Sequence, residues 1–221
     1  MIRARGARVG GRRCISVFTQ VLGFLNPQPQ LHREEVVVWE SLGGNHGGFI
    51  PNWRCVDDSD YGGKSHSAVT THTVDEGKGP SFIRVSGAVV EFDDKETKKV
   101  KGGFCAILGN CRPVLDLRDC SGLQITMRSS QTQTFTVNLK SASLFEDDMY
   151  QIRCELAASS EWRNLKIPFE KFQLTARGME REYHRANDSL RVESLGFLFK
   201  EDDMRNGQHI QLDIKRIAAY P

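Results

Sequence analysis

The chain has 221 residues, 39% of them hydrophobic and 26% charged, a composition typical of a globular domain with no apolar run near the roughly 20 residues of a membrane-spanning helix. The net charge of +2 is uneven, because residues 1–33 carry six Arg and no acid. The other 24 basic and 28 acidic residues leave residues 34–221 at −4, which argues against nucleic-acid binding, a function that needs a basic face.

The Arg-rich segment 1–33 is typical of a mitochondrial targeting segment, with a plastid leader or an uncleaved basic tail as alternatives. A secretory signal fits less well, because the apolar stretch after Cys14 is short. Pro27 and Pro29 mark a linker, since neither fits a helix interior or a central strand. We therefore expect an extension over residues 1–33 and one domain over residues 34–221.

After the linker, short runs of β-branched or alternating residues recur, separated by Gly-rich turns. Phe135, Val137 and Leu139 alternate with polar residues, which is typical of a strand with one buried face, and residues 210–214 repeat this pattern. Many short strands predict an all-β sandwich or barrel. The predicted strands are 36–39, 67–74, 81–85, 88–92, 104–108, 123–127, 134–139, 151–156, 162–167, 195–199 and 210–217. Helical periodicity is weak after residue 42, and the expected exceptions are an amphipathic N-terminal segment, a turn near 169–172 and part of 176–188.

Residues 58–65 are similar to a phosphate-binding loop but miss that motif by one position. Gly63-Lys64-Ser65 supplies its end, whereas the first Gly of the motif falls on Asp58. The carboxylates of Asp58 and Asp60 would repel a phosphate, and the next residues are β-branched and polar, so no helix follows. We therefore expect a loop between two strands.

No set of residues indicates catalysis. The Gly-x-Ser-x-Gly elbow is absent, and His66 and His72 lie too far apart on one predicted strand to chelate a metal. The six cysteines form no Cys-x-x-Cys pair, so we expect reduced thiols. The sequence thus predicts a protein without catalytic residues, metal or cofactor.

Several separated segments, taken in order, resemble one known family. They are 53–65, 102–107, 116–123, 150–151, 161–172, 194–197 and 210–217. The set is similar to the complex I intermediate-associated protein 30 family over about residues 36–218, and 161–172 is the strongest segment.

This resemblance implies an antiparallel β-sandwich, a jelly roll of the galactose-binding-like kind. It also implies a non-catalytic protein-binding module of mitochondrial respiratory complex I (NADH:ubiquinone oxidoreductase), on the matrix side of the inner membrane. The implied role is an assembly factor or chaperone for a membrane-arm intermediate, or a retained accessory subunit. The implied partners are complex I subunits or assembly intermediates, other assembly factors and, peripherally, the inner membrane.

Two residue sets follow from the matched segments. The expected binding loop comprises Trp53, Asp58, Asp60, Tyr61, Gly62, Gly63 and Ser65. The expected fold-keeping set comprises Gly102, Gly103, Phe104, Trp162, Pro168, Phe169 and Phe172. Pro168 cannot donate to a ladder and so fits a strand end, while Phe169 and Phe172 can plug one end of the core.

The sequence departs from the family's pattern in two ways. Arg128-Ser129-Ser130-Gln131 stands where the family often carries a Gly-Asp-Gly turn, and 93–101 and 176–188 have the character of insertions. The alternative function is a carbohydrate-binding β-sandwich module, for which Trp39, Trp53 and Tyr61 are candidate aromatics. A nucleotide-using enzyme ranks last, because no dinucleotide fingerprint is present.

Overall fold

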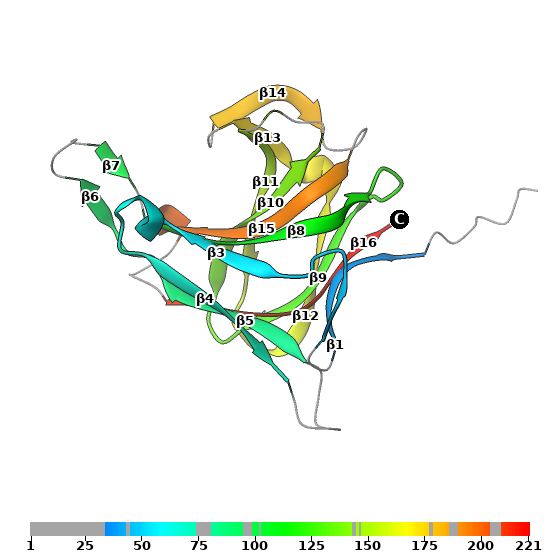
Figure 1. Ribbon diagram of the computed structural model, residues 1–221, viewed down its shortest axis with the longest axis horizontal. Coiled ribbons are helices and arrows are strands. Elements are labelled where there is room, and N and C mark those ends of the chain that lie inside the picture. Colours follow the sequence, from blue (N-terminus) through cyan, green and yellow to red (C-terminus); the bar gives the residue numbers. More distant parts are fainter. Residues whose placement is uncertain are drawn as a thin grey trace, which may run out of the picture. The chain divides into compact units, whose positions relative to one another are not determined.

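The computed structural model describes residues 34–42, 45–73, 81–94, 99–101, 103–142, 145, 147–176, 179–185, 190–203 and 209–221. The segment 1–33 and Gly102 lie outside them, so the expectations for these residues stay predictions. The described chain is mostly strand, with short 3-10 turns at η1 (Asp58–Tyr61), η2 (Phe169–Lys171) and η3 (Glu201–Asp203) (Figure 1). None of the described helices has the length and apolar character needed to cross a bilayer.

Sheet A is built around the last strand of the chain. Its strands run in the order β12 (Ser159–Pro168), β9 (Gly122–Ser129), β16 (His209–Tyr220), β1 (Val36–Leu42) and β2 (Asn45–Gly48). The first half of β16 also pairs with β5 (Phe82–Ala88), which pairs with β4 (His66–His72). One long strand therefore holds β9 on one side and both β5 and β1 on the other.

Sheet B faces sheet A across the core. Its order is β14 (Met179–Arg185), β13 (Gln173–Ala176), β11 (Asp148–Leu156), β10 (Gln133–Ser141), β15 (Arg191–Lys200), β8 (Phe104–Asp116) and β3 (Trp53–Asp57). All its pairings are antiparallel. With sheet A it forms the antiparallel β-sandwich that the sequence predicts. A hairpin of β6 (Phe92–Asp94) and β7 (Lys99–Lys101) lies in the first insertion-like stretch.

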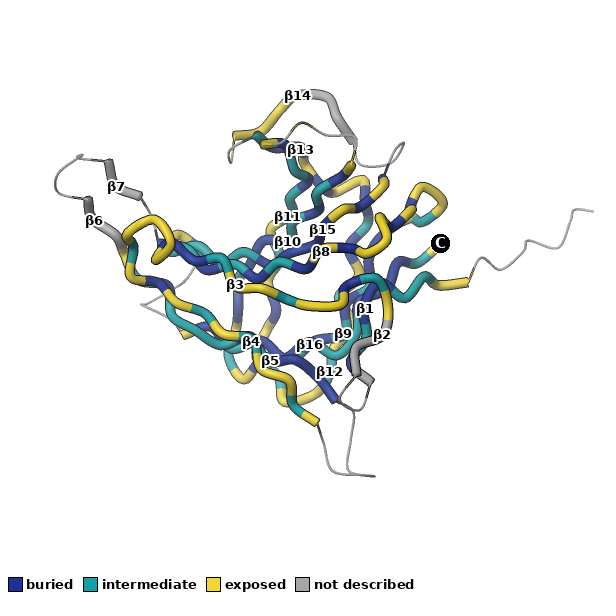
Figure 2. The backbone as a smooth tube through the Cα atoms, viewed as in Figure 1, coloured by how far each residue is buried: buried dark blue, intermediate teal, exposed yellow. Residues whose placement is uncertain are grey.

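The inward residues of both sheets form one continuous core. Phe135, Val137 and Leu139 are fully buried, as their alternation predicts, and so are Leu212 and Ile214. Figure 2 shows buried and more exposed positions alternating along these strands. Burial of one face of each strand stabilises a sandwich, because the apolar faces of the two sheets pack against each other and are removed from water.

A row of aromatic rings joins the two sheets, from the partly buried Trp53 of the edge strand β3 to the core. Trp39 of sheet A meets Trp53 of sheet B edge to face, with ring centroids 5.8 Å apart. Trp53 contacts Phe197 at 6.0 Å, and Phe197 contacts Phe135 at 5.9 Å. Edge-to-face and tilted pairs at these distances are favourable beyond their burial. Trp39 and Trp53 therefore serve packing between the sheets.

A buried carboxylate closes the corner between β3 and β4. Asp58 accepts hydrogen bonds from Ser65 N–H (2.8 Å), Ser65 Oγ (2.6 Å) and Phe104 N–H (3.0 Å). Asp57 accepts two more from Ser67, at 2.7 Å each. A Cβ on Gly63 would overlap the Asp58 carboxylate, so the close approach requires glycine there. We call Asp57, Asp58, Gly63, Ser65 and Ser67 the clasp, because they tie β3 and β8 of sheet B to β4 of sheet A.

Two of the expected elements are wrong, and both have a physical reason. Residues 89–91 leave the sheet instead of forming the expected strand 88–92, because Ser65 Oγ accepts a hydrogen bond from the Val90 N–H at 3.0 Å. That N–H group is then not available to a ladder. The expected helical part of 176–188 is instead β14, which pairs with β13. Hairpin pairing overrides the weak local helical pattern.

The described cysteines are free thiols. Cys105 and Cys111 are buried, whereas Cys55 is exposed. Burial raises the pKa of the Cys111 thiol to about 11, and burial with the nearby Asp57 carboxylate also raises the pKa of Cys105. Both thiols therefore stay protonated at neutral pH and act as small apolar core residues.

Asp58→Asn is expected to lower the free energy of unfolding by about 2 kcal/mol or more, since an amide places an N–H group against buried donors. Urea denaturation measures the change. Asp60→Asn, in the same 3-10 turn but exposed, is the matched control and should change stability by less than about 0.5 kcal/mol. Equal effects of the two variants would contradict the structural role given to the clasp.

Candidate functional site

The expected binding loop divides into buried and exposed residues. The side chains of Asp58 and Ser65 point inward and are bonded within the clasp, and Trp53 packs in the aromatic row. Tyr61 is 70% exposed, with its ring 6.4 Å from that of Phe104. A binding role for this loop stays a prediction, and of its side chains Tyr61 and Asp60 are the ones that face solvent.

The expected fold-keeping residues that the structure describes lie in three different places. Phe169 and Phe172 are buried with ring centroids 6.2 Å apart, and Pro168 is the last residue of β12. Gly103 is buried against the backbone of Val90. Trp162, however, is half-buried on the outer face of sheet A, away from the core.

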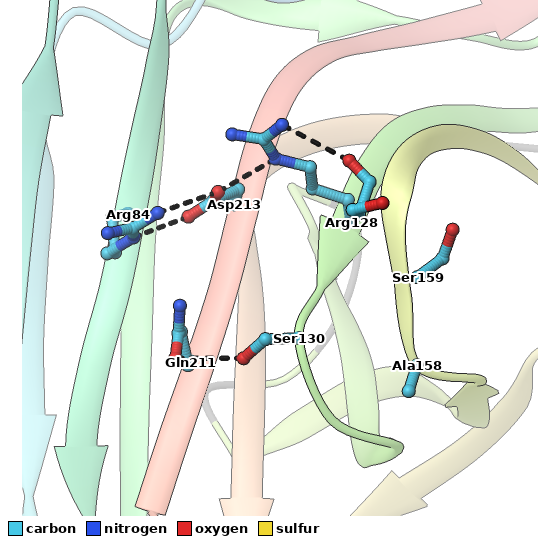
Figure 3. A pocket seen from close by; sticks show the side chains of 8 residues that line it. Arg84, Arg128, Ser130, Ala158, Ser159, Gln211 and Asp213 are labelled. Carbon is cyan, nitrogen blue, oxygen red and sulfur yellow. Dashed lines mark hydrogen bonds and ion pairs between the residues drawn. The ribbon is translucent and has the colours of Figure 1, made fainter.

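A pocket of about 540 Å³ opens on this outer face of sheet A. Its lining comes from β5, β9, β16, the start of β12 and the connecting residues next to β9 and β12, and it consists of Arg84, Arg128, Ser130, Ala158, Ser159, Ser160, Gln211 and Asp213. Figure 3 shows the two arginines reaching the same carboxylate from opposite sides. Strand alternation explains the arrangement, because Gln211 and Asp213 lie between the inward-facing Ile210, Leu212 and Ile214.

The centre of the pocket is an Arg–Asp–Arg group. Arg84 Nε and Nη2 donate to the two oxygens of Asp213 at 2.7 and 3.0 Å, and Arg128 Nε donates to Oδ2 at 3.0 Å. The Asp213 side chain is 5% exposed, against 32% for Arg84 and 29% for Arg128. The hydrogen bond to Asp213 raises the pKa of Arg84. Since one carboxylate meets two cations, the group carries one net positive charge.

Aromatic side chains hold the arginines in place. The Arg128 guanidinium lies 4.5 Å from the Trp162 ring centroid and 5.1 Å from that of Phe82. Phe82 also stacks on His72 at 4.9 Å. Phe82 is buried although it lies on the outer face, because His72, Trp162 and the arginines cover it. Such cation–π contacts fix the position of a charge without neutralising it.

This arrangement suits recognition of a charged group more than catalysis. Both Asp213 oxygens are already bonded to guanidinium groups, so the carboxylate is not available as a base. Among the described residues, no cluster of His, Cys, Asp and Glu has the geometry to hold a metal ion.

Sequence reasoning did not identify the pocket, although it noted some of its residues. Arg128 and Ser130 belong to the segment that departs from the family's Gly-Asp-Gly turn, and both line the pocket. The signal for Asp213 is a charged residue between core positions of a strand that alternates apolar and polar residues. No local pattern connects it to Arg84, which lies 129 residues away.

Asp213→Asn is expected to destabilise the protein by about 1–3 kcal/mol, because two guanidinium groups would lose their shared counter-ion. This figure is below that of a fully buried pair, since the arginines are about one-third exposed. The check is urea denaturation at neutral pH. Asp116→Asn breaks the exposed Asp116–Arg118 pair and should leave the midpoint unchanged. Equal shifts would show that Asp213 is no more than a surface charge.

Several solved structures share this fold at low sequence identity. The family 11 carbohydrate-binding module of cellulase Lic26A-Cel5E from Clostridium thermocellum matches with a TM-score of 0.54 and 16% identity, over 85% of this chain and 94% of that one. The same family's module in complex with a β-1,3-1,4-mixed-linked tetrasaccharide matches with a TM-score of 0.52 and 16% identity, over 84% and 96%. A family 30 carbohydrate-binding module matches with a TM-score of 0.50 and 12% identity, over 84% and 99%. At these identities the likeness shows the fold alone.

The comparison of sequences is more specific. No curated protein sequence matches this chain. The profile of the family described as Complex I intermediate-associated protein 30 (CIA30) matches residues 45–214, which is most of the chain and nearly all of the sandwich. The chain therefore belongs to the complex I intermediate-associated protein 30 family.

Proposed function

We propose that this chain is a non-catalytic protein-binding module of mitochondrial respiratory complex I. It acts as an assembly factor that holds a membrane-arm intermediate, or it stays in the complex as an accessory subunit. The observation that carries the proposal is the family match over residues 45–214. The partners are complex I subunits or assembly intermediates, and the place is the matrix side of the inner membrane.

The N-terminal composition and the buried carboxylates support this proposal. Six Arg without an acid in residues 1–33 are compatible with import into mitochondria, with residues 34–221 as the functional domain. The buried carboxylates of Asp57, Asp58 and Asp213 are all bonded to protein donors, as expected of a scaffold. The sandwich then acts through the shape and charge of its outer surfaces, where partner side chains can reach Arg84, Arg128 and Tyr61.

Depletion of the protein is expected to lower the amount of assembled complex I while the other respiratory complexes persist. Native-gel complexome profiling of mitochondria measures both, and re-expression of the full chain is the control. Co-migration with sub-assemblies would identify an assembly factor, and co-migration with the mature complex an accessory subunit. Normal complex I after depletion would contradict the proposal.

Carbohydrate binding is the second candidate, favoured by the fold shared with carbohydrate-binding modules. Sugar recognition of this kind needs exposed aromatic rings flanked by polar groups. Of the three candidate aromatics, Trp39 is fully buried, Trp53 is partly buried against it, and Tyr61 is the one that is largely exposed. A single exposed ring is a poor platform for a chain of sugars.

We therefore expect no binding of a β-1,3-1,4-mixed-linked tetrasaccharide in isothermal titration calorimetry. Tyr61→Ala serves as the matched variant. Saturable binding by the native protein that Tyr61→Ala abolishes would instead support the carbohydrate-binding function.

A further inference from the structure

We propose that the pocket formed by Arg84, Arg128, Ser130, Ser159, Ser160 and Gln211 around Asp213 is a binding site for a carboxylate, the acidic side chain of a partner protein segment. The assignment of a protein segment as the source of the carboxylate rests on the proposed function. The preference for a singly charged anion rests on the pocket alone.

The first support is the balance of charge. Two guanidinium groups and one carboxylate leave a net charge of +1 in the pocket. A carboxylate of charge −1 neutralises this excess. A phosphate monoester, at about −1.5 to −2 near neutral pH, would leave negative charge next to Asp213.

The second support is the balance of hydrogen-bond donors and acceptors. A guanidinium has five N–H donors, and in the described contacts Arg84 Nη1 and Arg128 Nη2 make no hydrogen bond. Both oxygens of Asp213, the pocket's one carboxylate, are already engaged. The pocket therefore offers charged donors whose acceptor must come from outside.

Neutral groups in the lining extend this supply of donors. Ser130 Oγ donates to Gln211 Oε1 at 3.0 Å, which orients the side-chain amide and, among the described contacts, leaves its N–H₂ group to donate (Figure 3). Ser159 Oγ accepts from the Glu161 N–H at 3.1 Å, and among the same contacts its own hydroxyl hydrogen remains to donate. With the two arginines, an anion in the pocket would thus meet donors from four strands, β5, β9, β12 and β16.

The third support is the rigidity of the arginines. Arg128 is fixed by the Trp162 ring at 4.5 Å, by Asp213 and by the Ser160 carbonyl at 3.2 Å. Arg84 is fixed by two bonds to Asp213. Charged donors that are already held in place lose little side-chain entropy on binding, and their partial exposure lets a side chain from a second surface reach them.

The test is an NMR titration that follows the side-chain Nε–H signals of Arg84 and Arg128 at constant ionic strength. The probe is N-acetylglutamate amide, and its neutral counterpart N-acetylglutamine amide is the control. We expect saturable shifts with the carboxylate probe and none with the amide. No shift with the carboxylate probe, or equal shifts with both, would overturn the proposal.

Variants at Gln211 test the charge argument without removing an Asp213 contact. Gln211→Glu is expected to weaken binding of the probe at least about tenfold, and Gln211→Lys to strengthen it. Gln124→Glu places the same charge on the same face of sheet A outside the pocket and should leave binding unchanged. Equal weakening by the two Glu variants would overturn the proposal. Urea denaturation of each variant checks the fold, and Gln211→Lys gives an independent answer if Gln211→Glu is unstable.

The source of the anion is tested separately. Co-sedimentation uses vesicles of equal parts phosphatidylcholine and phosphatidylglycerol, and inorganic phosphate replaces the probe in a parallel NMR titration. We expect no vesicle binding that depends on Gln211 and weaker binding of phosphate than of the carboxylate. Vesicle binding that Gln211→Glu abolishes would replace the protein segment by a lipid headgroup. A normal amount of assembled complex I after depletion of this protein would contradict the proposed function but would not change the result of the titration. Failure of the proposed function and failure of the carboxylate site are therefore distinguishable.

Discussion

The fold depends on the burial of one carboxylate, Asp58, without a cation beside it in the described structure. Taking a carboxylate out of water is costly unless strong hydrogen bonds replace its hydration. Ser65 and the Phe104 N–H supply these bonds at 2.6–3.0 Å. Because Phe104 begins β8 of sheet B and Ser65 leads into β4 of sheet A, the charge can be satisfied only when both sheets are in place.

The clasp also affects the outer face of sheet A through a chain of pairings. It places the start of β4, β4 pairs with β5, and β5 pairs with β16 in a register that puts Arg84 opposite Asp213. β9 pairs with the other edge of β16 and puts Arg128 opposite the same residue. The position of Arg84 in the pocket is therefore linked to the clasp through backbone registers, whereas Arg128 is placed by the separate pairing of β9 with β16.

Two of the buried carboxylates, Asp58 and Asp213, are satisfied in different ways, and the difference bears on function. Asp58 is bonded by neutral donors within the fold, so its site is closed and structural. Asp213 is bonded by two cations, so its site keeps an excess positive charge and free donors at the surface. The large aromatics follow the same division, since Trp39 and Trp53 belong to the core while Trp162 supports an arginine on the outer face.

The sequence by itself determined the fold class, because one-face burial is written locally in alternations such as Phe135, Val137 and Leu139. The ordered short motifs also identified the family, since they need no knowledge of spatial neighbours. Only the tertiary structure decided where the pocket lies and that the clasp is closed. Arg84 and Arg128 lie 129 and 85 residues from Asp213, and local periodicity says which face a residue takes but not which strand becomes its neighbour.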